Sequence, residues 1–327
     1  MTTSLTDRMF HKSTTVSEED VQQLKKGGQR FDPVEVHPPK RGDIPATLDT
    51  FIKGILELQS KWFGLVNASP VTAYEIRRPV NNRLRFQYAV PTKRLDRKLR
   101  TQLKTEIPEL KFSTGTNGIP VSKDTSVGGG ILTPGRKDCY PLQTEFDSPA
   151  VNALTGLLHR HSMQNTSIVV QILFKPVVGH PVKHRWWTRN TYQRIGYLRK
   201  NKTGSLPWHD RPPTPREKRQ ADAIERKAGT SKFHTTIRFL VIGAGENTPS
   251  RVKELSGGFN IFENPETGQY LDTITVKNVR ESKIIEYAET VAQREHSGTP
   301  SFRTSIPELA ALVSLPNRRQ QNIQNQP

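Results

Sequence analysis

The chain has 327 residues, a formal net charge of +18 and a pI near 10.1. Hydrophobic residues make up 33% of it, mean hydropathy is −0.65, and the longest apolar run, Phe239 to Ala244, is far too short to cross a bilayer. The single cysteine, Cys139, excludes an internal disulfide and any zinc site built on several cysteines.

The first half of the chain predicts an arm followed by a small α+β unit. Residues 1–45 are polar and contain a proline-rich run, so we expect a flexible N-terminal arm that packs little and holds no signal peptide. Residues 46–146 form the first unit. Its predicted elements are a helix at 46–61 with Leu58 on the apolar face and Trp62 closing it, strands at 71–78 and 83–90, a helix from about Pro91, and a strand ending at Phe112.

The second half predicts a larger unit after a long connection. Residues 113–150 are rich in glycine, proline, serine and threonine, and they predict a loop with one strand near Tyr140–Phe146. Residues 147–316 form the second unit, and 317–327 are a polar tail. Its predicted elements are helices at 148–162, 214–229, 249–257, 280–295 and 305–315, and strands at 167–175, at 234–242 and over QYLDTITV; the strand at 167–175 is apolar on both faces and therefore central.

Capping boxes mark the start of two of these helices. Thr214 and Glu217 frame Pro215, and Ser305 and Glu308 frame Ile306-Pro307, which is the pattern in which a hydroxyl and a carboxylate satisfy free backbone N–H groups. The last helix has too wide an apolar face for a dangling tail. We therefore expect it to pack on this chain or on a partner.

The order of elements predicts the fold class. Both units follow the outline of a split βαβ sandwich, so we expect an α+β protein with two ferredoxin-like units joined by a long loop and with flexible termini. Such units present surface loops rather than a deep catalytic cleft.

Motifs for catalysis and metal binding are incomplete. Gly130 and Gly135 have the glycine spacing of a phosphate-binding loop, but the lysine comes one place late, at Lys137, and the hydroxyl is missing. We interpret this segment as a loop. We expect no catalytic residue, no metal site, no cofactor and no small-molecule substrate.

One segment stands out by composition. Residues 175–232 hold fifteen lysines and arginines against four acidic residues, and three of the four tryptophans. Cations interleaved with flat rings suit contact with phosphates and stacking on bases. Within an insert at 176–213, the candidate DNA-contact residues are Lys183, Arg185, Trp186, Trp187, Arg189, Arg194, Tyr197, Arg199 and Lys200.

Two interpretations of this basic aromatic segment stay open. In the first, it binds DNA. In the second, Trp186, Trp187 and Tyr197 pack the insert onto the sandwich while the cations are merely solvated. The basic helix face at 93–104 is a second candidate surface, for which a solvated face is the favoured interpretation.

Several segments resemble a known group of proteins. They are AYEIRRPVNNRLRFQYAVPTK with the helix and PEL after it, VVQILFKPV followed by Trp186-Trp187, ADAIERKAGTSKFHTTIRFLVIG, and IPELAALVSLP. Together they resemble the N-terminal, non-ATPase region of archaeal and bacterial type IV secretion DNA-transfer ATPases, the conjugative coupling-protein relatives of FtsK-like pumps. The likeness covers roughly residues 46–316 by order of elements, and the catalytic motifs of that family are missing.

The resemblance implies a non-enzymatic accessory or assembly module of a DNA-transfer or packaging machine, encoded by a mobile genetic element. Such a module would dock on a separately encoded ATPase and contact DNA through the basic aromatic segment. The alternative is a stand-alone basic nucleic-acid-binding protein of a plasmid or virus, and an enzyme of unrecognised type is a third reading. We expect a cytoplasmic protein without an integral membrane segment, held at the inner face of the membrane only through a partner.

Overall fold

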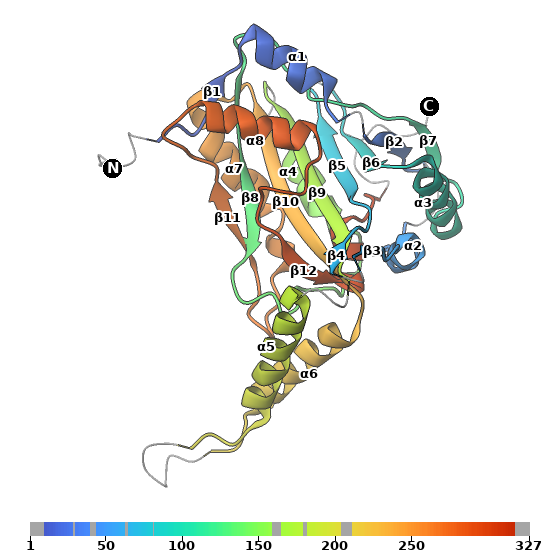
Figure 1. Cartoon of the computed structure of the whole chain (residues 1–327), viewed down its shortest axis with the longest axis vertical. Helices are drawn as coiled ribbons and strands as arrows, with labels where there is room; N and C mark the ends of the chain where they lie inside the picture. The colour runs from blue at the N-terminus through green and yellow to red at the C-terminus, as the bar shows by residue number, and fades with distance from the viewer. Residues whose placement is uncertain are drawn as a thin grey trace.

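A computed structural model describes residues 10–28, 30–39, 44–62, 65–80, 82–158, 165–178, 182–203 and 211–317, and the side chains of 182–184 lie outside that description. Its centre is a ten-stranded antiparallel sheet with helices on both faces (Figure 1). The mixed α and β content agrees with the sequence. No helix among the described residues is long and apolar enough to cross a membrane.

The strands of the large sheet follow the order β1-β8-β10-β9-β5-β6-β2-β7, with β11 also paired to β8 and β12 to β10. Their bounds are β1 Thr14–Thr15, β2 Asp32–His37, β5 Thr72–Arg78, β6 Arg85–Val90, β7 Lys111–Thr114, β8 Ser126–Pro134, β9 Ser167–Pro176, β10 Lys232–Ile242, β11 Leu271–Thr275 and β12 Phe302–Ser305. A separate hairpin consists of β3 Ser60–Lys61 and β4 Val66–Asn67.

Helices cover the two faces unequally. One face is packed by α2 Asp49–Ile55, α3 Lys93–Glu106, α4 Val151–Leu158, α7 Thr248–Gly257 and α9 Ile306–Leu312, and the other by α1 Glu18–Lys26 and α8 Ser282–Ala292. Alternate residues of β9 divide between these layers: Ile168, Val170 and Ile172 face the larger cluster, and Val169 faces the smaller one. The apolar run of β9 is therefore buried on both sides.

The expected division into two ferredoxin-like units is not confirmed. Strand β9, predicted as central in the second unit, pairs with β10 on one side and with β5 of the expected first unit on the other. A strand that is apolar on both faces needs a neighbour along each edge, and β5 supplies the second one. The strands of both halves consequently belong to one sheet.

Residues assigned to the flexible arm are part of the packed structure, which corrects that prediction. Within 10–28 and 30–39 lie β1, α1 and β2, and β2 is paired on both sides, with β6 and with β7. Val34 and Val36 are buried. The sequence DPVEVH does not predict a strand, because it contains Pro33 and three ionisable residues among only two apolar ones.

Residues interpreted as a loop between the halves contain a central strand. Strand β8 includes Gly130 and pairs with β10 and β11, whereas no strand forms at Tyr140–Phe146. A Cβ on Gly129 would lie 2.1 Å from the Phe239 carbonyl oxygen, and one on Gly130 would lie 2.3 Å from Val252 Cγ1. Glycine is required here because α7 and α8 approach the sheet closely, and glycine carries no strand signal.

The predicted helix at 46–61 is shorter than expected. Helix α2 ends at Ile55, and the chain continues into the β3–β4 hairpin. Leu58, predicted on the apolar face of the helix, is 59% exposed, and Trp62 is 75% exposed. The hairpin is tied to the end of β9, because the Asn67 Nδ2 group donates to the Pro176 carbonyl at 2.7 Å.

A polar row crosses the middle of the sheet beneath α8. Arg238, Gln171, Glu75 and Gln87 are neighbours on consecutive strands, and hydrogen bonds of 2.6, 2.7 and 2.6 Å join them in that order. Arg294, just after α8, donates to Glu75 from above at 2.7 Å. Burial raises the pKa of the Glu75 carboxyl, but the guanidinium groups of Arg294 and Arg77 outweigh it and hold that pKa well below its usual range.

The last predicted helix packs on this chain. Its capping box is formed as expected: the Ser305 hydroxyl accepts from the Glu308 backbone N–H, and the Glu308 carboxylate accepts from the Ser305 backbone N–H. Leu309, Ala310 and Leu312 are buried in the larger cluster. The Tyr74 and Tyr88 hydroxyls donate to the carbonyls of Ser314 and Val313, both at 2.7 Å, so the end of α9 is fastened to β5 and β6.

Candidate nucleic-acid interface

The basic aromatic segment forms a hairpin of two helices, α5 Val182–Arg199 and α6 Pro215–Gly229. Figure 1 shows the two helices side by side, extending away from the end of the sheet where β9 leaves and β10 begins. Ile195 and Leu198 of α5 pack on Ala221 and Ile224 of α6. The expected capping box of Thr214 and Glu217 is present at the start of α6.

Helical spacing sorts the side chains of α5 into three directions. Thr191, Ile195 and Leu198 are buried toward α6 and the sheet. Four exposed residues follow one another at spacings of four, three and eight positions, so they lie on one side of the helix and form an outward stripe. They are Arg185, Arg189, Tyr192 and Lys200. Trp186, Asn190, Arg194 and Tyr197 lie on the side between these two.

The exposed stripe carries uncompensated positive charge. Arg185, Arg189 and Lys200 have no carboxylate partner among the described residues. Coulomb repulsion between them is tolerated only because water screens it, and an anion along the stripe would relieve it. We name Arg185, Arg189, Tyr192 and Lys200 the outer stripe of α5.

Other predicted contact residues are already engaged within the chain. Arg199 pairs with Glu225 and Asp222 of α6, both at 2.6 Å, and the hydrogen bonds that it donates to these carboxylates raise its pKa above the ordinary arginine value. The Arg194 Nε group donates to the Tyr140 hydroxyl at 2.5 Å. Lys183 lies in α5, but its side chain is outside the described part of the structure.

The aromatic residues of α5 have different environments. Trp187 is half-buried, and its Nε1 group donates to Asp138 Oδ1 at 2.6 Å, so this ring anchors the hairpin to the sheet. Trp186 is 68% exposed and Tyr197 is 55% exposed, and these two rings do not hold the hairpin in place. The packing interpretation therefore holds for Trp187, and stacking by Trp186 and Tyr197 stays a prediction.

A pocket of about 700 Å³ lies between α5 and the sheet. We name it the α5 pocket. Rings of α5 and cations from three elements surround it. Its lining includes Trp186, Trp187, Asn190, Arg194 and Tyr197 from α5, Lys137, Asp138 and Cys139 from the loop after β8, and Arg303 from β12.

Two cations lie over the Trp187 ring. Arg303, which lines the α5 pocket, is 4.8 Å from the ring centroid, and Lys232, which is outside the lining, is 5.4 Å from it. Burial, and next the charge of Arg303, lower the pKa of Lys232 to about 8 and that of His234 to about 4. Burial also raises the pKa of the Cys139 thiol, so this cysteine is no activated nucleophile.

The residues that complete this pocket from the sheet were not among the predicted contacts. Lys137, Asp138 and Arg303 are distant from α5 in sequence, and the pairing of β12 with β10 brings Arg303 beside them. The Asp138 carboxylate links the parts: one oxygen accepts from Trp187 and the other from the Arg303 backbone N–H at 3.0 Å. No local pattern in the sequence could have found this arrangement.

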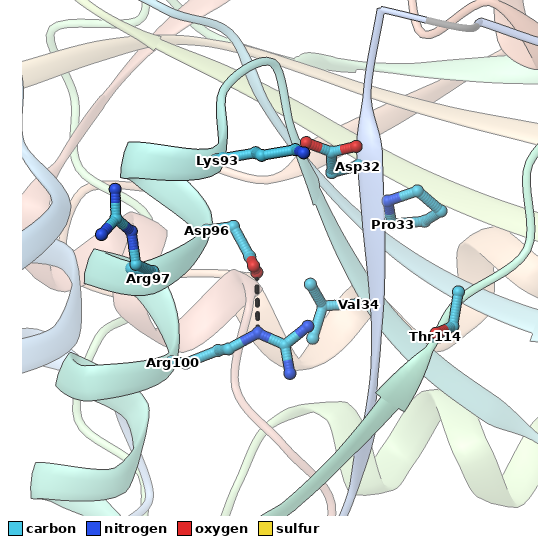
Figure 2. Close-up of a pocket in the computed structure, with 8 residues that line it drawn as sticks. All are labelled: Asp32, Pro33, Val34, Lys93, Asp96, Arg97, Arg100 and Thr114. Carbon is cyan, nitrogen blue, oxygen red and sulfur yellow. Dashed lines mark hydrogen bonds and ion pairs between the residues drawn. The ribbon is translucent and has the colours of Figure 1, made fainter.

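The basic face of α3, the second candidate surface, is compensated in part. Arg94 and Lys98 pair with Glu57, at 2.5 and 3.3 Å. Figure 2 shows a pocket of about 440 Å³ between α3 and β2, in which Asp96 pairs with Arg100 at 2.9 Å and the Lys93 side chain points toward Asp32. This acidic lining makes the α3 face a poorer phosphate site than the outer stripe of α5.

The fold and this surface define a mixed α/β domain with one continuous antiparallel sheet and a projecting, basic two-helix hairpin. Residues 6–327 match a family described as a domain of unknown function (DUF8128), and the chain belongs to that family. No curated protein matches the chain.

Proposed function

We propose that the protein binds DNA through the α5–α6 hairpin, mainly by contact with phosphates. The observation that carries this proposal is the outer stripe of α5, where three cations without described partners flank an exposed tyrosine on a helix that extends away from the sheet. Each phosphate neutralised by a lysine or arginine releases condensed counterions, which drives binding. Contact of this kind tolerates any base sequence.

The segments that resemble the DNA-transfer ATPases lie in the strands β5, β6, β9 and β10 and in the helices α3, α6 and α9, together with Trp186-Trp187 of α5. That likeness is one of element order, and the DNA contact is argued from the surface of α5 alone. The protein is proposed to be a non-enzymatic binding module, because the α5 pocket offers an unactivated thiol and no nucleophile–base pair.

Salt dependence tests the DNA contact. Replacing Arg185, Arg189 and Lys200 together with glutamine is expected to reduce the slope of log affinity against log salt by about 2 on single strands and nearly 3 on duplex, since each lost phosphate contact removes about 0.7 or 0.9. The measurement is fluorescence anisotropy with labelled DNA at several salt concentrations. Thermal stability should stay unchanged, because these charges are exposed.

A matched variant on the second candidate surface serves as control. Lys93, Arg97 and Lys104 of α3 are also exposed, and changing them to glutamine removes the same net charge. The salt slope of this control should stay close to that of the unchanged protein. An equal decrease of the salt slope in both variants would mean that binding depends only on the net charge of the protein. Binding that does not depend on salt would contradict the proposed DNA contact altogether.

A second proposed role is docking on a separately encoded DNA-transfer ATPase, as the resemblance implies. The observation that favours a protein partner is the β3–β4 hairpin, where Trp62, Leu65 and Val66 are 75%, 66% and 49% exposed. Large apolar side chains gathered on one projecting element are typical of a contact surface. This surface lies outside the α5–α6 hairpin, so both roles are compatible.

Docking is tested with an FtsK-like ATPase from the same genetic element. The unchanged protein should bind the purified ATPase in solution, and the double change Trp62→Ser and Val66→Ser should weaken that binding at least tenfold, as loss of a buried tryptophan at an interface does. Exposed Ile261 provides the control, because Ile261→Ser removes a similar apolar side chain elsewhere. Equal binding by all three proteins would exclude the hairpin as the contact.

A further inference from the structure

The two rings at the rim of the α5 pocket have different environments. Two cations lie on Tyr197: the Arg194 guanidinium is 5.0 Å from the centroid of this ring, and the Lys202 amine is 3.6 Å from it. Trp186 is 68% exposed and lies beside the anchored Trp187 on α5. A ring already held by its neighbours, as Tyr197 is, loses little conformational freedom when a flat ligand contacts it.

The charge of the lining selects for an anion next to that flat group. Lys137, Arg194 and Arg303 line the pocket, and Asp138 is the only carboxylate among the described residues that line it. Both oxygens of Asp138 already accept hydrogen bonds, from Trp187 and from the Arg303 backbone. Lys137 and Arg194 have no carboxylate partner among the described residues, so they can offer their charge to an anion in this half-enclosed space.

The pocket and the outer stripe are neighbouring sides of the same helix. Arg185 of the stripe precedes Trp186 of the pocket rim, and Lys200 follows Tyr197 by less than one turn. A strand whose phosphates follow the stripe therefore has its bases within reach of the pocket.

We propose that the α5 pocket takes one unstacked base of a single DNA strand, with Trp186 and Tyr197 contacting its faces or edge and Lys137 and Arg194 holding the adjacent phosphate. This rests on the proposed DNA contact and adds its substrate class: single-stranded rather than duplex DNA. The volume of about 700 Å³ lies within the range of about 300–1,000 Å³ usual for small-ligand pockets and admits a nucleotide. A base that is stacked and paired in a duplex would first have to be extruded.

The test compares two strands with the same phosphates. One probe is a short thymidine oligonucleotide, and the other is an oligonucleotide of equal length made only of abasic sites. The full chain is expected to bind the thymidine probe about 5- to 150-fold more tightly, the range of one base–ring stack. A duplex of equal length should bind like the abasic probe.

Three variants test whether the α5 pocket causes the tighter binding of the thymidine probe. Trp186→Ala should bring the two probes close together, and Asn190→Trp, which fills the pocket, should do the same while leaving the salt slope unchanged. Tyr270→Ala is the matched control, because Tyr270 is 44% exposed but belongs neither to the outer stripe nor to the lining of the α5 pocket. It should preserve the preference for the thymidine probe. A circular dichroism melt of each variant confirms that it is folded.

The outcomes separate this inference from the proposed function. Equal binding of thymidine and abasic probes, with a salt slope that depends on the outer stripe, would overturn the base pocket and leave the DNA contact standing. No binding of either probe at low salt would remove both. Thymidine monophosphate binding as tightly as the oligonucleotide, or an acidic tyrosine-containing peptide displacing it, would assign the pocket to another ligand and overturn the inference.

Discussion

Replacing Arg294 with methionine is expected to destabilise the protein by about 3–5 kcal/mol, because it leaves the buried Glu75 carboxylate without its main counter-charge. The Arg294 guanidinium donates to both oxygens of Glu75, at 2.7 and 3.2 Å, and also to Asn117 Oδ1 at 2.7 Å. Both side chains are fully buried. Urea unfolding followed by circular dichroism measures the change.

The backbone conformation of Arg294 and a control variant make this substitution informative. Arg294 has a φ of 57°, and methionine has a similar preference against that backbone conformation, so the difference reports the side chain. Arg100→Met is the control, since Arg100 pairs with Asp96 one turn away in the same helix and is partly exposed. Its loss should cost at most about 1 kcal/mol. Equal losses in the two variants would contradict a structural role for the buried pair.

Glu308→Ala is the second substitution expected to have a large effect, again about 3–5 kcal/mol. The Glu308 carboxylate is buried and accepts from Lys227 Nζ at 2.9 Å, from the Leu142 backbone N–H at 2.8 Å and from the Ser305 backbone N–H at 2.7 Å. Its removal leaves a buried ammonium and two buried N–H groups unpaired. Thermal unfolding should show a single transition at a much lower temperature.

The chain offers a matched comparison for this prediction. Glu217 has the same place in the capping box of α6 but is only partly buried, with its side chain 18% exposed, so Glu217→Ala should cost clearly less than Glu308→Ala. Adding Lys227→Met to Glu308→Ala should restore part of the lost stability, because the unpaired ammonium is then gone. If the double variant were less stable than the single one, the loss would come from packing rather than from charge.

Much of the local structure follows from the sequence, and the joining of the parts does not. Patterns among neighbouring residues predict the apolar strands β9 and β10, the leucine face of α3 and the capping boxes of α6 and α9. The pairing of β5 with β9 depends on residues almost a hundred positions apart. Strand β8 was missed because its glycines serve close packing of helices on the sheet, which periodicity does not detect.

The candidate surface was predictable only in part. Alternation of cations and rings located α5, but charge counting could not separate Arg199, which pairs with α6, from Arg189, which has no described carboxylate partner. It also could not separate the anchoring Trp187 from the exposed Trp186. Those distinctions require the fold, since Asp138 and Arg303 reach Trp187 from the sheet.

The α5–α6 hairpin is inserted between two strands that are direct neighbours: Pro176 at the end of β9 lies opposite Phe233 at the start of β10. An ordinary tight turn could close that gap, so the sheet does not need the hairpin in order to form its pairing. The strand pairing thus does not fix the length of the hairpin, whereas Lys227 of α6 and Trp187 of α5 tie its base to Glu308 and Asp138. The proposed binding part and the sheet therefore meet at the single strand spacing between β9 and β10, and only the residues of the hairpin outside these two ties can vary without loss of a buried contact.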